Sequence, residues 1–216
     1  MLSLGFPPSL RQVLCIGAHC DDVEIGCGAT LLALARARPD VQLTIAVFTS
    51  EEGRDAESQR ALQEFLGSSV RWHSEFAAFR NSHFPAQWSQ IKEHLESIGR
   101  RSNPDLIFTH CRDDLHQDHR TLAELTGSVF RNHWVLEYEI PKYDGDLGRP
   151  NVYVPLDETL VARKVETLLR CFPSQVNKPW FTADTFRGLM RLRGIECQSP
   201  GGFAEAFFAR KLTLRP

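Results

Sequence analysis

Short apolar runs alternate with segments of helical periodicity through residue 130, and this alternation restricts the chain to few folds. The apolar runs cover residues 12–18, 41–48, 69–72 and 106–109, and each is followed, directly or after a loop, by a segment with helical spacing. Strands joined by helices of this length form parallel βαβ units with right-handed crossovers. We therefore predict an α/β fold built on a mostly parallel sheet flanked by helices.

The remaining elements are predicted from the same periodicities. Helices are expected at residues 25–37, 56–66, 87–99, 121–130, 156–171 and 184–192, and further strands at 135–140, 152–154 and 204–209. The 216 residues are enough for one sizeable core and short for two. We therefore expect a single domain over residues 1–216.

Charge and cysteine usage exclude several classes of protein. The 25 basic and 27 acidic residues nearly balance, and no basic block is present, so we expect no nucleic-acid partner. The six cysteines form no CxxC pair, which predicts reduced thiols in a cytoplasmic protein. No apolar stretch reaches the ~20 residues of a membrane span, and the N-terminus does not resemble a secretory signal. The oligomeric state stays open, and a homo-oligomer is compatible with the sequence.

Two polar clusters follow predicted strands. His19-Cys20-Asp21-Asp22-Val23-Glu24 comes directly after the first strand, and Asp113-Asp114-Leu115-His116-Gln117-Asp118-His119 comes after the strand at 106–109. The carboxyl ends of parallel strands form the rim where open α/β sheets bind ligands. We therefore expect the two clusters to meet in space and to hold a metal ion.

The spacing within the clusters assigns roles to their residues. A catalytic zinc site needs three nitrogen or oxygen ligands and one open position for water. His19 and Asp22, three residues apart, share one side of a turn, and His119 supplies a third ligand from a neighbouring strand end. Asp21 then stands beside the metal as a proton acceptor, and His116 faces the open position. Asp114 and Asp118 are placed to hold the imidazole N–H groups.

Simpler explanations exist for each cluster alone. Asp21 and Asp22 could cap a helix, and residues 116–119 could be a solvated helix start. The other five histidines lack such partners, so we expect them at the surface, in the core or in a pocket wall: His73, His83, His94, His110 and His133. The glycines of Gly26-x-Gly28 are expected to let the first helix pack closely.

Both clusters resemble the signatures of one known family. Residues 18–24 are similar to the AHPDDE motif, and residues 114–120 to the DxHPDHR motif, of the LmbE-like (PIG-L) zinc-dependent N-deacetylases. The loop 49–54 and the closing Phe203-Ala204-Glu205-Ala206-Phe207 also match, so the similarity covers nearly the whole chain.

The resemblance implies a Rossmann-like domain with one divalent metal, usually zinc, that removes an acetyl group from an amino sugar. By position, His19, Asp22 and His119 match the metal ligands, Asp21 the general base, and His116 the residue that stabilises the oxyanion or donates a proton. Arg54 falls near the family's substrate-binding arginine. Asn81 stands where relatives often carry a substrate-binding aspartate. The expected partner is an N-acetylated amino-sugar small molecule or glycoconjugate.

The resemblance is incomplete, and the residues alone leave other functions open. Cys20 and Gln117 replace prolines of the signatures, which puts a thiol near the expected metal. The alternatives are a metal-dependent amidohydrolase acting on a non-sugar amide, a metal-free nucleotide-sugar binding protein, and a two-metal phosphoesterase using Asp113, Asp114 and Asp118.

Overall fold

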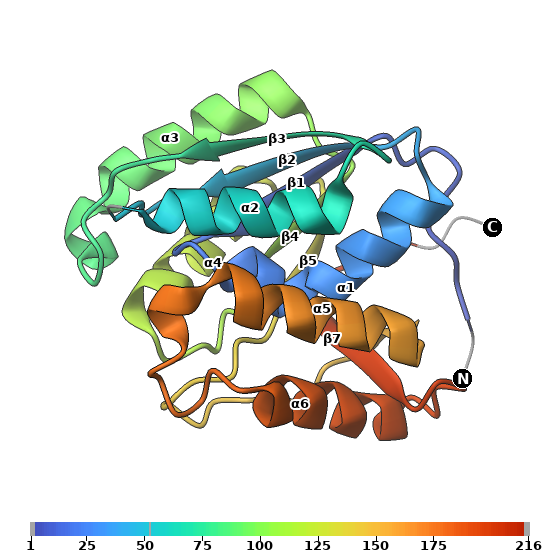
Figure 1. The fold of residues 1–216 in the computed structure, drawn as a ribbon. Coiled ribbons are helices and arrows are strands. Elements are labelled where there is room, and N and C mark those ends of the chain that lie inside the picture. The colour runs from blue at the N-terminus through green and yellow to red at the C-terminus, as the bar shows by residue number, and fades with distance from the viewer. Residues whose placement is uncertain (1–2, 52, 214–216) are drawn as a thin grey trace.

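A seven-stranded sheet runs through the part of the chain that the computed structural model describes, residues 3–51 and 53–213 (Figure 1). The strands lie in the order β3-β2-β1-β4-β5-β7-β6. Their bounds are β1 Gln12–Gly17, β2 Gln42–Val47, β3 Arg71–Phe76, β4 Leu106–His110, β5 Trp134–Tyr138, β6 Val152–Leu156 and β7 Phe203–Ala209. Strands β1 to β5 are parallel, and β7 runs antiparallel to both β5 and β6. The predicted α/β class with a mostly parallel sheet is confirmed.

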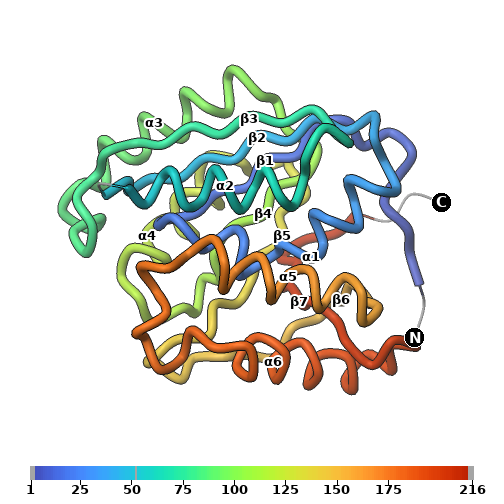
Figure 2. Tube along the Cα trace, viewed as in Figure 1, coloured from blue at the N-terminus to red at the C-terminus, as the bar shows by residue number. Residues whose placement is uncertain are grey.

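Helices cover both faces of this sheet. Helices α1, α2, α5 and α6 pack with one another on one face, and α3 and α4 pack together on the other, as the trace in Figure 2 shows. Their bounds are α1 Asp22–Ala37, α2 Arg54–Leu66, α3 Trp88–Ser102, α4 Gln117–Val129, α5 Glu158–Cys171 and α6 Ala183–Glu196, with short 3₁₀ turns η1 Phe84–Gln87 and η2 Pro173–Gln175.

The two helical layers give the sheet two separate cores. Along β1, Val13 and Cys15 join the cluster under α1, α2, α5 and α6, whereas Leu14 and Ile16 join the cluster under α3 and α4. This alternation follows from the two-residue period of a strand. A strand buried on both faces must be apolar throughout, which is why β1 reads as an uninterrupted apolar run in the sequence.

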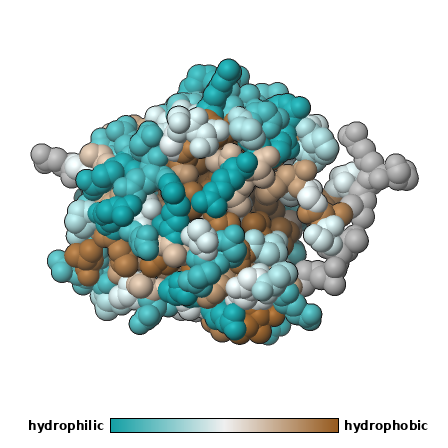
Figure 3. All heavy atoms as spheres, turned by 45° about the vertical axis from the view of Figure 1, so that its right-hand side comes forward, coloured by the Kyte–Doolittle hydropathy of each residue, from teal (hydrophilic) through white to brown (hydrophobic). Residues whose placement is uncertain are grey.

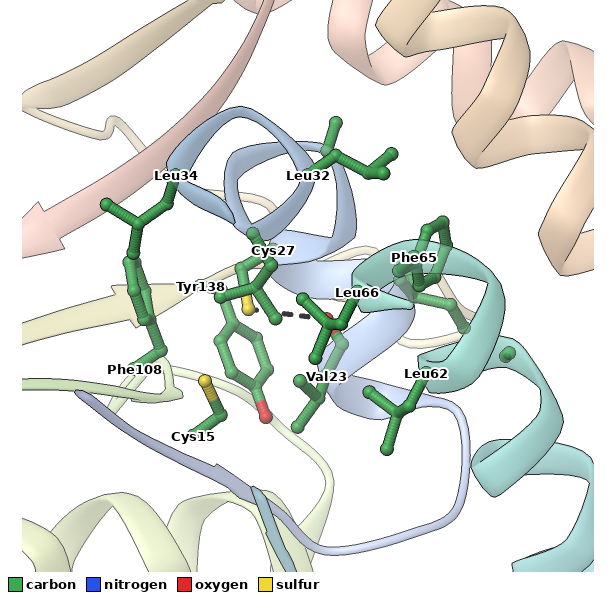
Figure 4. Packing of buried hydrophobic residues seen from close by; sticks show 14 of the residues in the cluster. Cys15, Val23, Cys27, Leu32, Leu34, Leu62, Phe65, Leu66, Phe108 and Tyr138 are labelled. Atoms are coloured by element: carbon green, nitrogen blue, oxygen red, sulfur yellow. Dashed lines mark hydrogen bonds between the residues drawn. The ribbon is translucent and has the colours of Figure 1, made fainter. Parts of the chain in front are cut away.

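Helix α1 lies very close to β5. A Cβ atom at Gly26 would overlap the ring of Tyr138, and one at Gly28 would stand 3.2 Å from the ring of Phe65. Tyr138 points into the core between Cys15 and Cys27 (Figure 4), and its hydroxyl donates to the carbonyl of Ile16 at 2.6 Å. Gly26 therefore sets the depth at which α1, and the polar residues at its start, sit against the sheet, and Gly28 lets α1 pack closely against α2.

Several element boundaries differ from the sequence prediction. Helix α1 begins at Asp22 rather than at residue 25, and α4 begins at Gln117 rather than at 121. The first turn of α4 is polar, and that of α1 places carboxylates on both sides of Val23, so apolar periodicity does not mark either start. Strand β3 covers 71–76 instead of 69–72, because pairing with β2 from Gln42↔Arg71 to Val47↔Phe76 decides its length.

On the face shown in Figure 3, hydrophobic residues reach the surface in separate groups between hydrophilic ones. None of the helices within the described residues combines the length and the apolar character needed to cross a membrane.

Candidate active site

Both polar clusters open into one pocket at the carboxyl ends of the parallel strands. The pocket has a volume of about 320 Å³. His19 and Asp21 reach it from the turn after β1, Asp22 from the first position of α1, and His116 and His119 from the start of α4. Because β1 and β4 are neighbours in the sheet, the two clusters lie side by side although about a hundred residues separate them.

The imidazole of His19 is oriented by a carboxylate from the second cluster. His19 Nε2 lies 3.2 Å from Asp118 Oδ2. A carboxylate only accepts, so Nε2 donates and Nδ1 is left with its lone pair facing the pocket. The backbone N–H of His19 donates to Asp22 Oδ2 at 2.7 Å, which ties the turn to the first residue of α1.

The imidazole of His119 is oriented in the same way by Asp114. His119 Nδ1 lies 3.0 Å from Asp114 Oδ2, so Nδ1 donates and Nε2 faces the pocket. Asp114 is itself held by the backbone N–H of His116 at 2.8 Å and by Lys142 Nζ at 3.1 Å. Burial alone would raise the pKa of Asp114, but the contact with His119 lowers it below its ordinary value.

The free nitrogens of the two rings face each other. His19 Nδ1 and His119 Nε2 are 3.2 Å apart, and Asp22 lies beside both, with Oδ2 3.4 Å from His19 Nδ1 and Oδ1 3.5 Å from His119 Nε2. Two ligands bound at ~2.0–2.1 Å in tetrahedral geometry stand roughly 3.3–3.4 Å apart. Two lone pairs at this separation repel unless a proton or a cation lies between them. The donor set therefore fits a single divalent cation.

The pKa values agree with a site made for a cation. Burial opposes the charged form of His19, but hydrogen bonds to Asp118 and Asp22 raise its pKa to about 10. Burial, together with the charge of His110, lowers the pKa of His119 to about 3. Burial also opposes ionisation of Asp22, yet the imidazoles of His119 and His110 lower its pKa well below its ordinary value. Without a metal, a single proton on His19 thus occupies the space between the rings.

His110 is a site residue that the sequence analysis missed. It is the last residue of β4, is completely buried, and places Nε2 3.1 Å from Asp22 Oδ2. Its ring stacks on that of His119 with centroids 3.9 Å apart. Two sets of side chains within the described residues could each hold a metal, His19 with His116 and His119, and Asp22 with His110 and His119. Its position in the sequence could have indicated this role, because His110 lies at the carboxyl end of a strand, as His19 does shortly after β1.

Asp21 lies beside this centre rather than in it. It precedes α1 with a φ of 154°, a conformation that residues with side chains rarely adopt, and its carboxylate makes no capping hydrogen bond to the helix. Instead, Oδ2 accepts from Arg54 Nη2 at 2.9 Å. Burial, and then the charge of Asp22, raise the pKa of Asp21 to about 6. A base titrating near neutral pH is suited to proton transfer.

His116 has one nitrogen occupied and one available. As the residue capping α4, it accepts the backbone N–H of Asp118 on Nδ1 at 3.3 Å. This contact assigns the ring proton to Nε2. Burial, and then the neighbouring charge of His19, lower the pKa of His116. A neutral imidazole with a free N–H therefore lines the pocket beside the rings of His19 and His119.

The two residues expected to bind substrate line the same pocket but already have partners. Arg54 donates to the carbonyl of Cys20, to Asp21, and to Ser174 Oγ at 2.7 Å. Asn81 Nδ2 donates to Glu51 Oε1 at 2.8 Å. Arg54 thus supports Asp21 directly, and Asn81 belongs to the outer wall of the pocket.

The thiol of Cys20 contacts the backbone and is not a reactive group of the site. Its Sγ lies 3.5 Å from the carbonyl of Thr49, and burial raises its pKa far above the usual range. The thiol stays protonated, so Cys20 acts as a small buried side chain that fills the position of the family's proline.

The three carboxylates on which a two-metal site would depend do not face one another around a second site. Asp114 and Asp118 each bind an imidazole N–H, and Asp113 is exposed. Among the described residues, both candidate metal sets include His119, so they do not define two independent sites.

Comparisons with known proteins agree with this geometry. Residues 14–130 match the family model described as "PIG-L: GlcNAc-PI de-N-acetylase", which spans both motifs. The uncharacterized deacetylase YaiS of Escherichia coli (strain K12) is 32% identical over 143 residues, covering 61% of this chain and 75% of that protein.

Solved structures share the fold. N,N′-diacetylchitobiose deacetylase from Pyrococcus horikoshii, complexed with its inhibitor MPG, superposes with a TM-score of 0.73 at 19% identity, covering 93% of this chain and 84% of that one. The 4-carboxy-2-hydroxymuconate hydratase GalB from Pseudomonas putida KT2440 superposes with a TM-score of 0.75 at 14% identity, covering 96% and 99%. Since the fold hosts both reactions, the motifs and the sequence relatives decide the family. The chain belongs to the PIG-L (LmbE-like) family.

Proposed function

We propose that this protein is a zinc-dependent N-deacetylase that hydrolyses the N-acetyl amide of an amino-sugar-containing substrate, releasing acetate and a free amine. The observation that carries the proposal is the face-to-face pair of imidazole nitrogens, 3.2 Å apart, with Asp22 beside both and the carboxylate of Asp21 adjacent. Membership of a deacetylase family supports the reaction type.

His19, Asp22 and His119 are the residues proposed to hold the metal. Two imidazole nitrogens and one carboxylate oxygen, with a fourth position open, form the donor set of a catalytic zinc site. When bound, the cation supplies Lewis-acid polarisation of the amide carbonyl and lowers the pKa of water toward ~7. Asp114 and Asp118 keep the two rings in the tautomers that point a lone pair at the cation.

Asp21 is proposed to move the proton, and His116 to stabilise the developing negative charge. Asp21 takes a proton from the attacking water as its oxygen bonds to the carbonyl carbon, and Arg54 keeps that carboxylate in place. Negative charge then develops on the carbonyl oxygen, where the Nε2–H of His116 donates a hydrogen bond. The carbon–nitrogen bond breaks as Asp21 gives the proton that it took from water to the leaving amine, and the products are acetate and the free amino sugar.

Acetate release tests the proposal. Purified protein is incubated with a panel of N-acetylhexosamine derivatives and with non-sugar acetamides, with and without a chelator, and its metal content is measured. We expect acetate from the sugar derivatives only, loss of activity with chelator and recovery with zinc, at one metal per chain. Acetate from non-sugar amides alone would favour an amidohydrolase of another class, and binding of nucleotide sugars without stoichiometric metal would refute the hydrolase.

A further inference from the structure

The connection between α5 and α6, residues 173–181, forms part of the pocket wall. Gln175, Lys178 and Trp180 line the pocket together with the two motifs. In Figure 2 this connection lies on the same side of the molecule as the start of α4. These residues fall outside the part of the chain that matches the family model, residues 14–130. The matched part of the chain, with both motifs, therefore does not include the wall that these residues form.

Hydrogen bonds fix the orientation of the Gln175 amide. Ser174 Oγ lies 2.5 Å from Glu57 Oε2, 2.7 Å from Arg54 Nη1 and 2.9 Å from Gln175 Nε2. The carboxylate can only accept, so the single hydroxyl hydrogen of Ser174 goes to Glu57. The hydroxyl oxygen must then accept from both Arg54 and Gln175. The amide nitrogen of Gln175 therefore faces Ser174, and its oxygen faces the other way.

The amide oxygen of Gln175 is buried without a partner. The residue is only 6% exposed, and no donor among the described residues bonds to Oε1. A buried acceptor left unpaired is costly, and native structures rarely keep one without a reason. Since Oε1 can only accept, the partner it lacks must be a donor, such as a hydroxyl group.

The same segment adds an aromatic wall. Trp180 packs against Phe181 with ring centroids 5.7 Å apart, and Lys178 Nζ lies 5.4 Å from the centroid of the Trp180 ring. An apolar ring surface next to a fixed polar acceptor is the combination that binds ligands with both an apolar face and hydroxyl groups. A sugar ring has both, with C–H groups on its faces and hydroxyls at its edge.

The acceptor is linked to the reacting groups by a short chain of contacts. Gln175 bonds to Ser174, Ser174 to Arg54, and Arg54 to Asp21 at 2.9 Å. A ligand whose acetamide lies at Asp21 therefore has its remaining atoms in the pocket that Gln175 lines.

We propose that Gln175 Oε1 accepts a hydrogen bond from one ring hydroxyl of the amino sugar that carries the acetamide, with the ring against Trp180. Gln175 is then a specificity-determining residue of the enzyme, and the inference rests on the proposed deacetylase function. It makes the segment 173–181 the element that distinguishes a sugar from a simple acetamide.

A double-mutant cycle between enzyme and substrate tests the inference. The substrates are methyl N-acetylglucosaminide and its 3-, 4- and 6-deoxy derivatives, and acetate release is measured with Gln175→Ala, with Gln175→Asn and with the exposed control Gln63→Ala. We expect Gln175→Ala to raise KM for the parent about tenfold with kcat within about twofold, as expected for one lost hydrogen bond to a buried acceptor. With the wild-type enzyme, one deoxy derivative should show the same tenfold rise in KM relative to the parent substrate. With Gln175→Ala, that derivative and the parent should have the same KM.

Gln175→Asn keeps an amide but withdraws the oxygen by one methylene, so it should raise KM in the same direction even where the alanine variant folds poorly. Gln63→Ala should match the wild type. The inference would be overturned if removing each hydroxyl raised KM by the same factor in the wild type and in both Gln175 variants. It would also be overturned if the Gln175 variants lowered kcat and left KM unchanged. Absence of acetate release from the wild type with every sugar would instead refute the deacetylase function, so the two failures are distinguishable.

Discussion

Asp118 Oδ2 accepts a hydrogen bond from His19 Nε2 at 3.2 Å, across 99 positions of the chain. The same carboxylate accepts the backbone N–H groups of Ser82 at 2.6 Å and Phe84 at 3.0 Å, and the residue is completely buried. Burial alone would raise its pKa, but the bond from His19 and the two backbone donors lower it. Asp118 thus connects the first cluster, the loop before η1 and the start of α4.

Asp118→Asn should therefore weaken metal binding without removing a ligand. The amide cannot accept from His19 and from both backbone groups as strongly, so the His19 ring loses its fixed tautomer. Changes to groups that orient ligands typically cost about 10- to 100-fold in metal affinity. Competition with a chelator of known affinity measures the loss. Asp184→Asn, an exposed acid in the first turn of α6, is the matched control and should leave affinity unchanged.

Asp21→Asn should separate catalysis from metal binding. The substitution keeps the size of the side chain but removes the proton acceptor, and general bases typically contribute 10²- to 10⁴-fold, so kcat should fall at least about 100-fold. Zinc content should stay near that of the wild type, because Asp21 is not among the three proposed ligands. A near-wild-type rate, or loss of the metal, would contradict its role.

The acid limb of the pH profile should report Asp21. Its pKa is raised to about 6 by burial and by Asp22, while Arg54 acts to lower it. The base must be ionised to accept a proton, and a bound cation beside it favours ionisation, so kcat/KM should fall as pH drops at or below about 6. Arg54→Ala removes a cation that favours ionisation and should move this limb to higher pH. An unmoved limb in that variant would show that another group sets it.

Much of this site follows from the sequence because the spacing within each of the two motifs restricts how its side chains can be arranged. His19 and Asp22 are close in sequence, and a strand end followed by a helix start leaves few ways to arrange them. His119 required an inference about topology, namely that the strands preceding the two clusters are neighbours and parallel. That inference rested on apolar runs long enough to be recognised, which strands buried on both faces always have.

Other features depended on tertiary context. His110 stands outside both motifs, and only the pairing of β1 with β4 brings it to Asp22. Gln175 ends the short 3₁₀ turn η2, which is too short to show a periodicity, and its importance depends on the hydrogen bonds of Ser174. The starts of α1 and α4 were predicted too late along the chain because charged and polar residues interrupt the apolar pattern there. Single-domain organisation and cytoplasmic location stay predictions.

Metal binding should release a proton. In the absence of metal, His19 has a pKa of about 10, so its ring is protonated at neutral pH, whereas a metal ligand must be deprotonated. Apparent zinc affinity should therefore rise about tenfold per pH unit between about pH 7 and 9, with one proton released per metal. Calorimetry in two buffers of different ionisation enthalpy counts the proton. An affinity independent of pH in this range would contradict the protonated state of His19.

Glu24 should make the protein less stable as pH rises. It is 1% exposed, accepts from Ser58 Oγ at 2.6 Å on Oε1, and has no partner among the described residues on Oε2. Burial raises its pKa from 4.5 to about 8. Between these values the folded state binds more protons than the unfolded state, so the free energy of unfolding falls with rising pH, by at most about 1.4 kcal/mol per unit.

Glu24→Gln cannot ionise and keeps an oxygen for Ser58, so the variant should lack this dependence. Its Tm should be close to that of the wild type at pH 5 and should exceed it increasingly from pH 6 to pH 9, measured with zinc saturating in both. Glu93→Gln, an exposed position on α3, should show a Tm difference that does not change over the same range. A Glu24→Gln difference that stayed flat or reversed sign between pH 5 and 9 would show that Glu24 is ionised in the folded protein throughout, and that its environment supplies a partner for the charge.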